Sequence, residues 1–411
     1  MTRIARLSLL ALVIATVAVA GCKKKDDKKN NKKKPKNTKV QPKGKTKTPP
    51  PKTDKPVTGE ALVAVVTKCW GAFDSENAKA YSDCYADNGT IELVDQVPMM
   101  PSDVTKAAKK DLMKMVGPYW AGFKLKGHLD LILVNGSNTA TIVRNEATND
   151  AAMGPMPASN KTTKTFGSQL SSFDAKGKIV KDMHFFDQNS MSGQMGMMPK
   201  GMPFRGAWEK SLWDAPIRVV AKNDDKEKKN LAAYKAWMVD AAAGDVKKVL
   251  AHYADDIVSR HMDSPKDMTG KKALGGMMTM MKAGFPDYKM KTNSVWAAGD
   301  WVVAHATVTA KNTGAIPGMI PKATNKEFSG SSLSFVRYEG GKIKEMVQFS
   351  NGFHMFAQLF PDKLKAMKEA MAKQMGGAGK APAKGDATKK PEKKPPTKNP
   401  PAKPPEVKKR G

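Results

Sequence analysis

A stretch of 20 residues occurs twice in this chain, and this repetition constrains the fold more than any other feature. The first copy, GKIVKDMHFFDQNSMSGQMG, begins at Gly177, and the second, GKIKEMVQFSNGFHMFAQLF, begins at Gly341. The offset of 341 − 177 = 164 residues needs no gap, so Asp187 lies opposite Asn351. A period of this length is too long for a solenoid unit and suits a whole small domain. The sequence therefore predicts two copies of one fold that differ at a carboxylate.

The first 21 residues have the features of a signal peptide. Arg3 and Arg6 give a positive start, and residues 7–20 form an apolar stretch that is short for a membrane span. The stretch ends in Val-Ala-Gly-Cys, which resembles the bacterial lipobox, where the cysteine is acylated and becomes the mature N-terminus. We therefore expect lipid on Cys22, which anchors the chain to a membrane without spanning it. The alternative is an ordinary secretory signal in which Cys22 happens to follow a glycine.

Two Lys/Pro-rich segments, residues 22–57 and 377–411, are predicted to be a disordered tether and a disordered tail. Residues 23–56 carry 15 Lys and 3 Asp, and residues 376–411 carry a net charge of +8, out of +31 for the whole chain. Such segments attract anionic lipids or envelope polymers. A solvated spacer is the alternative. Nucleic acid is not the expected partner, because both segments lack aromatic residues and the protein is expected to be exported. We expect the protein in the bacterial cell envelope, anchored to the outer membrane on its periplasmic side or at the surface.

The cysteine count agrees with export. Once Cys22 is acylated, Cys69 and Cys84 remain as an even pair in an oxidising compartment. They fall in two consecutive expected helices, so a disulfide is geometrically feasible. Two buried thiols are the alternative.

The part between the two basic segments is long enough for two domains with separate cores. Domain 1 is expected at residues 58–199 and domain 2 at 226–362, joined by a linker at 200–225 and followed by a helix at 363–376. Each domain begins with apolar residues at helical spacing and continues with strands separated by turn signals. Helices first and a run of strands afterwards predict an α+β fold.

Several short motifs of domain 2 occur in an order that resembles the SnoaL-like polyketide cyclases, also called ester cyclases, of the nuclear transport factor 2-like superfamily. These motifs are Phe285-Pro286-Asp287, Gly299-Asp300, NTGAIPGMIPKATNK, Gly341-Lys342-Ile343 and Gln358-Leu359. The resemblance covers most of residues 227–360, whereas domain 1 is more divergent and lacks Phe-Pro-Asp. It implies two cone-shaped domains, each with helices packed in a curved antiparallel sheet around an apolar pocket. In the cyclases, a pocket aspartate at the end of the last strand acts as acid and base in an aldol closure.

The last strand of each domain supplies the candidate pocket residues. We take the more apolar face as the inner one, since residues of one parity share a face of a strand. That face holds Met183, Phe185 and Asp187 in domain 1, and Val347, Phe349 and Asn351 in domain 2. A carboxylate among apolar walls has a raised pKa and suits a general base. Asp187 is therefore the catalytic candidate, with a structural strand-end role as the alternative.

Two further positions follow from the family resemblance. The histidine that the family places at the end of its first short strand corresponds to His261, while domain 1 has Leu93 or a neighbour there. The family's histidine before Thr-Gly is replaced by Asn312 in domain 2 and by Asn149 in domain 1. His261 is thus a second catalytic candidate, with a structural histidine as the alternative, and Asn312 is a candidate pocket residue.

No phosphate loop, zinc spacing or Ser/His/Asp arrangement is found, and no cofactor or metal is expected. Residues 191–202 are rich in methionine, whose thioether suits Cu(I), but a flexible linker or a lining for apolar ligands is the expected role of this segment. The sequence predicts a lipid-anchored exported protein with two SnoaL-like domains that bind small apolar ligands with weak or no catalysis. The alternative is an active cyclase, isomerase or hydrolase that uses Asp187 as general acid and base.

Overall fold

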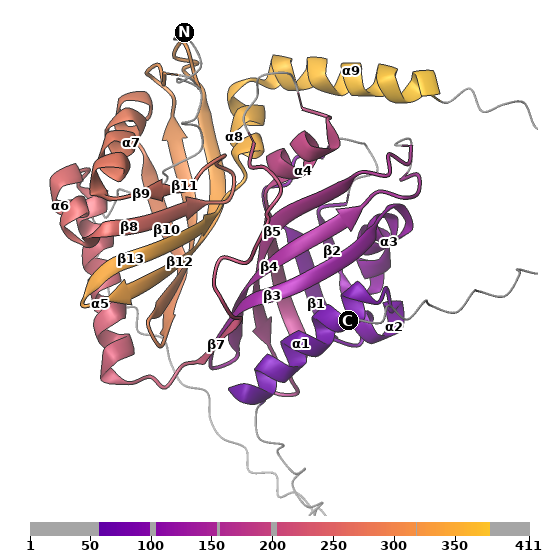
Figure 1. Cartoon of the computed structure of the whole chain (residues 1–411), viewed down its shortest axis with the longest axis horizontal. Helices are drawn as coiled ribbons and strands as arrows, with labels where there is room; N and C mark the ends of the chain where they lie inside the picture. Colours follow the sequence, from indigo (N-terminus) through magenta and orange to yellow (C-terminus); the bar gives the residue numbers. More distant parts are fainter. Residues whose placement is uncertain (1–56, 99–103, 154–156, 199–203, 318, 379–411) are drawn as a thin grey trace, which may run out of the picture.

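The structure is a computed structural model that describes residues 57–98, 104–153, 157–198, 204–317 and 319–378 (Figure 1). The lipidation position Cys22, the tether at 22–57 except its last residue, and the tail beyond residue 378 lie outside these ranges. None of the helices in the described ranges is long and apolar enough to cross a membrane.

Domain 1 contains a helical pair, a crossover helix and a strand meander. Its elements are α1 (Glu60–Asp74), α2 (Ala78–Ser82), β1 (Tyr85–Leu93), β2 (Lys106–Ala108), η1 (Lys109–Asp111), α3 (Leu112–Gly122), β3 (Lys124–Asn135), β4 (Asn138–Thr148), β5 (Thr162–Phe173), β6 (Ile179–Phe186) and α4 (Gln188–Met195). Its sheet has the order β2-β1-β6-β5-β4-β3, and the linker strand β7 (Ile217–Val220) adds a seventh strand beside β3.

Domain 2 repeats this plan. Its elements are α5 (Asp225–Ala242), α6 (Val246–Ala251), β8 (Tyr253–His261), β9 (Met268–Thr269), α7 (Lys271–Gly284), β10 (Lys289–Ala298), β11 (Trp301–Lys311), β12 (Glu327–Glu339), β13 (Lys342–Phe349) and α8 (Gly352–Leu359), followed by α9 (Pro361–Ala378). The sheet order β10-β11-β12-β13-β8-β9 is the order of domain 1 read from the other end, strand for strand. The predicted α+β class is confirmed, with two curved sheets of seven and six strands.

The sheets were expected to be antiparallel, but each contains one parallel strand pair between its long strands. The first long strand of each domain runs parallel to the last one, β1 beside β6 and β8 beside β13. A helical crossover (α3 or α7) connects the first strands to the meander, so no hairpin forces β1 or β8 to run antiparallel to its neighbour. The ends of β1 and β6, and of β8 and β13, therefore lie side by side.

The two domains pack together through one face of each sheet, with the helices α1, α3, α5, α6 and α7 on the outer sides (Figure 1). We call the apolar side chains between the sheets the interdomain cluster. Domain 1 contributes Val94, Leu131, Leu133, Ala140, Ile142, Phe166, Met183 and Phe185, and domain 2 contributes Met262, Ala298, Trp301, Val303, Leu333, Phe335, Val347 and Phe349. The ring of Phe185 lies 5.7 Å from that of His305 across this interface.

This packing corrects the predicted orientation of the last strands. Met183, Phe185, Val347 and Phe349 belong to the interdomain cluster, so their shared face meets the other domain and is not the inner face, as was expected. Of the four, Phe185 also borders a cavity of domain 1. Both faces of these strands are buried, and the side chains at the interface between the domains are more apolar than those of β6 in the interior of domain 1. The more apolar face is therefore the outer one, and the interior faces carry Asp182 and His184 in β6 and Met346 and Gln348 in β13.

The linker also joins the domains. The indole of Trp213 donates to the buried carboxylate of Glu345 at 3.2 Å, and its ring packs edge-on against Trp301 at 5.6 Å. The guanidinium of Arg205 donates to the carbonyl of His261 at 3.1 Å and to Asp267 at 2.8 Å. These contacts hold the linker against domain 2, and the pairing of β7 with β3 holds it against the sheet of domain 1.

Each helical pair is fastened to the strand that follows it. A disulfide joins Cys69 of α1 to Cys84, which directly precedes β1. At the corresponding place in domain 2, His252 directly precedes β8, and its Nε2 lies 2.7 Å from the carboxylate of Asp240 in α5. A hydrogen-bonded contact between side chains thus stands at the place of the covalent link of domain 1.

Candidate functional site

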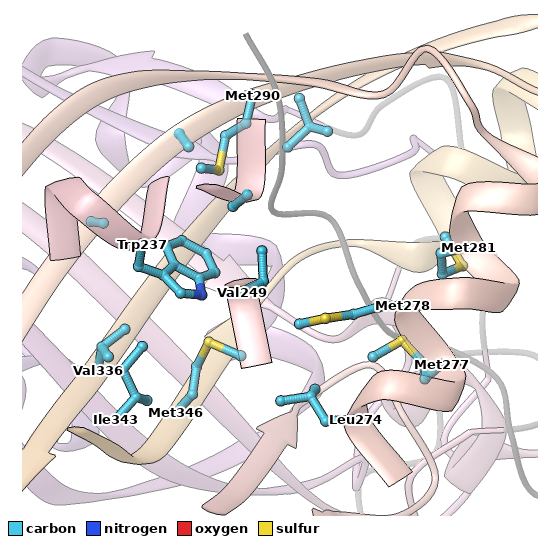
Figure 2. Close-up of a cluster of buried hydrophobic side chains, with 14 of the residues drawn as sticks. Trp237, Val249, Leu274, Met277, Met278, Met281, Met290, Val336, Ile343 and Met346 are labelled. Atoms are coloured by element: carbon cyan, nitrogen blue, oxygen red, sulfur yellow. The ribbon is translucent and has the colours of Figure 1, made fainter. Parts of the chain in front are cut away.

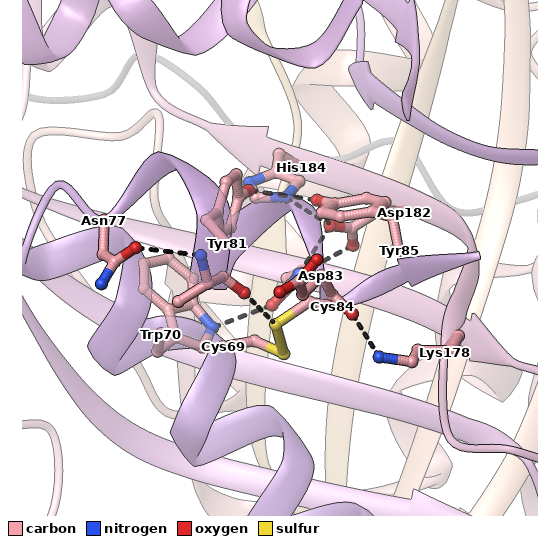
Figure 3. The surroundings of a disulfide bond; sticks show 12 residues. Cys69, Trp70, Asn77, Tyr81, Asp83, Cys84, Tyr85, Lys178, Asp182 and His184 are labelled. Atoms are coloured by element: carbon pink, nitrogen blue, oxygen red, sulfur yellow. Dashed lines mark hydrogen bonds and ion pairs between the residues drawn. A yellow bond between two sulfur atoms is a disulfide. The ribbon is translucent and has the colours of Figure 1, made fainter. Parts of the chain in front are cut away.

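A buried carboxylate organises the interior of domain 1. Asp182 of β6 is fully buried and accepts hydrogen bonds from the hydroxyls of Tyr85 (2.7 Å) and Ser171 (2.8 Å) and from the amide of Gln169 (2.8 Å). Its Oδ2 also lies 2.9 Å from Nε2 of His184 (Figure 3). Burial alone would raise the pKa of Asp182, but the charge and hydrogen bond of His184, with the two hydroxyl bonds, bring that pKa below its ordinary value.

The carboxylate fixes the imidazole of His184. Asp182 and His184 are two residues apart on one strand, so both point to the same face of the sheet. When Nε2–H donates to Asp182, the proton-accepting nitrogen of the neutral ring is Nδ1. Trp70 borders the imidazole, with ring centres 6.3 Å apart, and its indole donates to Gln169 at 2.9 Å. A histidine oriented by a carboxylate can hydrogen-bond a ligand or transfer a proton.

His184 borders two neighbouring cavities inside domain 1, with volumes of about 150 Å³ and about 130 Å³. The residues that border both are Phe73, Leu93, Tyr119, His184 and Phe186. Together the two volumes approach the lower end of ligand pockets, roughly 300 Å³. The walls are mainly aromatic and aliphatic, and the Asp182 network lies behind the polar contact point at His184.

Methionine occupies several of the matching positions in domain 2. The strand registers and the shared Tyr-Ala-Asp and Ala-Gly-Phe sequences pair the positions of the two domains. By this pairing, domain 2 has Met238 for Trp70, Met281 for Tyr119, Met290 for Gly127 and Met346 for Asp182. Gly127 lies eight residues before the hairpin position Asn135, as Met290 lies before Ala298.

Figure 2 shows Met290 and Met346 among the buried side chains around Trp237. Met281, Met290 and Met346 all belong to the apolar core of domain 2, together with Met277 and Met278. A flexible thioether chain fills irregular space well. Methionine in domain 2 therefore belongs to an apolar core and takes the positions of Tyr119 and Gly127 of domain 1's cavity wall.

The structure places the predicted base Asp187 at the domain interface. Asp187 is the N-cap of α4: it accepts from the backbone N–H of Asn189 at 3.0 Å and from the hydroxyl of Ser190. It is 2 % exposed and is not among the residues that border the two cavities. Burial, and then the nearby carboxylate of Asp263 in domain 2, raise the pKa of Asp187 to about 7.

The neighbourhood of Asp187 is shared by both domains. Burial raises the pKa of Asp263 to about 6, although the hydroxyl of Ser350 donates to it at 2.8 Å. Asn351, the counterpart of Asp187, caps α8 and donates to the carbonyl of Asp95 in domain 1 at 2.7 Å. The carboxylate and the amide at this repeated position thus cap equivalent helices and contribute to the interface.

His261 lies inside domain 2, next to Gln348 on the neighbouring strand. Its Nε2 is 3.1 Å from the hydroxyl of Ser259, and burial, with the charge of Arg205, lowers its pKa to about 3. The ring is therefore neutral at physiological pH. In domain 1 the position next to His184 is Leu93. The interior histidine therefore lies on the last strand, β6, in domain 1 but on the first strand, β8, in domain 2.

Asn312 holds a loop together. Its amide donates to the carbonyls of Gly284 (3.1 Å) and Gly314 (2.8 Å), and its oxygen accepts from the N–H of Thr324 (2.7 Å). Asn149 makes the same three contacts in domain 1, with Gly122, Ala151 and Ser159. The fully buried side chain fixes the loop before β12, and its hydrogen-bonding capacity is used within that loop.

Sequence reasoning missed Asp182 and His184 as site residues because they lie on the less apolar face of β6. The available signal was the spacing Asp-x-His, which places a carboxylate and an imidazole on one face of a strand. Ser259-x-His261 in domain 2 repeats that spacing with a hydroxyl. Within the described ranges, no three His, Cys, Asp or Glu side chains are arranged to hold a metal ion.

Residues 232–359, most of domain 2, match the family model of the SnoaL-like polyketide cyclases. No curated protein matches the chain. Among solved structures, AclR from Streptomyces galilaeus is 22 % identical, over 32 % of this chain and 96 % of that chain, with a TM-score of 0.30. An LEH-like epoxide hydrolase from M. tuberculosis is 15 % identical (33 % and 92 % covered, TM-score 0.28), and an NTF2-like protein from Burkholderia xenovorans LB400 is 16 % identical (32 % and 97 %, 0.27).

Proposed function

We propose that this chain binds a small, largely apolar molecule in domain 1 and that domain 2 serves as a packed structural partner. The observation that carries the proposal is the contrast between the two interiors. Domain 1 has cavities bordered by the oriented His184, whereas domain 2 has methionine at the positions of Gly127 and Asp182. Apolar walls with one fixed polar group are typical of sites that bind apolar ligands in one orientation.

The test is to fill the cavity as domain 2 does. Gly127→Met copies Met290 and places a side chain against Asp74 and Trp70, whose atoms lie 3.0 and 3.3 Å from the position of a Cβ at residue 127. A neutral solvatochromic dye of naphthalene size should bind the natural protein and bind the variant at least tenfold more weakly. The control is Gly71→Met, because Gly71 is exposed and a Cβ there meets no atom within 4 Å. Equal dye binding by all three proteins would contradict the proposal.

A second candidate function is proton transfer on a bound carbon acid, as a cyclase or isomerase requires. The hydrogen bond between Asp182 and His184 favours it, because the carboxylate stabilises the imidazolium that forms when His184 takes a proton. This makes His184 the base, in place of Asp187. Deuterium exchange into a cyclic 1,3-diketone should be accelerated by the natural protein and by Asp187→Asn. It should fall to the uncatalysed rate in His184→Gln, which carries the residue of domain 2. Loss of exchange in Asp187→Asn alone would instead favour Asp187.

We further propose that the protein is lipid-anchored in the bacterial envelope through Cys22, with the basic segments contacting anionic envelope polymers. The Val-Ala-Gly-Cys sequence and the charge of +12 in residues 23–56 support this. Cys22→Ser should release the protein from the membrane fraction. Mass spectrometry of the natural N-terminus should show an acylated cysteine, and an unmodified N-terminus downstream of Cys22 would contradict the anchor.

A further inference from the structure

The wall of the larger cavity contains a carboxylate next to an indole. Asp74, the last residue of α1, accepts a hydrogen bond from the backbone N–H of Gly127 at 3.0 Å. Trp70 lies one helical turn earlier and borders the same cavity. Both side chains are half-buried, so each has one side toward the cavity and another packed against the protein.

Gly127 permits this arrangement. A Cβ at residue 127 would lie 3.0 Å from Oδ1 of Asp74 and 3.3 Å from Cε3 of Trp70, closer than ordinary van der Waals contact. Any other residue would push the carboxylate or the indole away from the strand. The glycine, the carboxylate and the indole therefore form one unit on the wall of the cavity. Domain 2 has Met290, Ala242 and Met238 at these positions and lacks all three.

The rest of the wall is rich in aromatic rings. Phe73 packs edge-on against Trp70 with ring centres 5.6 Å apart, and Tyr119, Phe123 and Phe186 border the same cavity. The faces of such rings attract cations by their quadrupole, by about 0.5–2 kcal/mol for each contact, with the larger value when water is excluded. A carboxylate beside an aromatic wall matches a ligand that is positively charged and apolar at the same time.

We propose that the domain 1 cavity selects a small organic cation, an amine or quaternary ammonium compound with apolar substituents, with Asp74 as counter-ion and Trp70 as cation–π partner. This inference rests on the proposed ligand-binding function and names the class of ligand. Burial raises the pKa of Asp74, and a bound cation would offset that effect.

Besides Asp74 and the phenol of Tyr119, three charged or titratable groups border this site: Lys126, Glu146 and His184. Glu146 is paired with Lys164 at 3.5 Å. Lys126, whose side chain is exposed, borders the cavity and lowers the pKa of Asp74 by its charge. It therefore competes with a bound cation for the carboxylate. His184 borders the cavity beside Trp70 and is paired with Asp182. Removal of Lys126 should thus strengthen cation binding, which no purely apolar pocket would show.

The test compares two probes of one shape, choline and its uncharged isostere 3,3-dimethylbutan-1-ol, as competitors of the neutral dye. In the natural protein, choline should compete at least about tenfold more strongly than the isostere, as one cation–π contact and one ion pair predict. Asp74→Asn keeps an acceptor for the N–H of Gly127 and should bring the two probes within about twofold. Trp70→Met, the residue of domain 2, should also reduce the preference, and Lys126→Ala should increase it.

The outcomes separate the two proposals. Equal competition by both probes in the natural protein, unchanged in Asp74→Asn, would overturn the cation inference and leave apolar binding intact. Failure of both probes to displace a dye that is sensitive to Gly127→Met would also overturn it. A dye that binds Gly127→Met and Gly71→Met equally would overturn the proposed function itself.

Discussion

Replacement of Asp187 by asparagine should stabilise the protein, and should do so more strongly as the pH rises. Asp187 is buried at the domain interface near Asp263, and its pKa is about 7 in the folded protein against an ordinary value of 3.8. The folded state thus holds this proton more tightly than the unfolded state does. The stability that the proton contributes is complete below about pH 4 and is lost as the pH rises from 3.8 towards 7.

The magnitude follows from the difference between the two pKa values. At 1.36 kcal/mol for each pKa unit, full ionisation of the buried carboxyl costs about 4 kcal/mol. Roughly 2–3 kcal/mol of this cost falls between pH 5 and pH 8, because part of the unfolded chain is already ionised at pH 5. Asparagine does not titrate, and Asn351 shows that it caps the equivalent helix α8.

Urea unfolding followed by tryptophan fluorescence at pH 5, 6, 7 and 8 measures this effect. The advantage of Asp187→Asn over the natural protein should grow by roughly 2–3 kcal/mol from pH 5 to pH 8. Asp174→Asn, in the exposed turn before β6, is a control for the general effect of removing a carboxylate. An advantage of Asp187→Asn that stays constant over this pH range would refute the assignment of a raised pKa to Asp187.

Four further variants test the fold. Replacing Cys69 and Cys84 by alanine should lower the free energy of unfolding by about 3 kcal/mol, because their sequence separation is 15 residues, with urea unfolding as the measurement. Phe335→Ala, in the interdomain cluster, should cost about 3–5 kcal/mol and increase amide exchange in both sheets; a loss confined to domain 2 would speak against the interface. Asn312→Ala should cost about 3 kcal/mol, since it leaves buried backbone groups unpaired, and the matched Asn149→Ala should cost a similar amount.

The order of helices and strands could be predicted because local signals agree with it. The Asn-Gly signal at 135–136 and the Gly-Asp signal at 299–300 mark the first hairpin of each meander, and Gly136 and Gly299 both have φ of +58°. This is the left-handed region that such turns require. The 20-residue repeat likewise corresponds to β6 with α4 and β13 with α8.

The inner and outer faces of the last strands could not be predicted from apolarity alone. Strands buried on both faces do not alternate cleanly between polar and apolar residues. In β6 the outer face, with Met183 and Phe185, is the more apolar one because it packs against the second sheet. The inner face carries Asp182 and His184, whose burial is compensated by hydrogen bonds from β1 and β5. Only the packing of the two sheets against each other shows that Asp182, on the more polar face of β6, lies in the interior of domain 1.

The methionine-filled interior of domain 2 has a consequence for how the two halves can diverge. Space left open inside a domain gives up the packing contacts that side chains filling it would make, and those contacts contribute to stability. Domain 2 is free of that loss at the matching positions and is joined to domain 1 over a whole sheet face. A rigid neighbour of this kind lets residues around Gly127 and Asp74 change with new ligands while the pair of domains stays folded. On the proposed function, one half of the duplicated chain can vary its ligand contacts and the other half supports it.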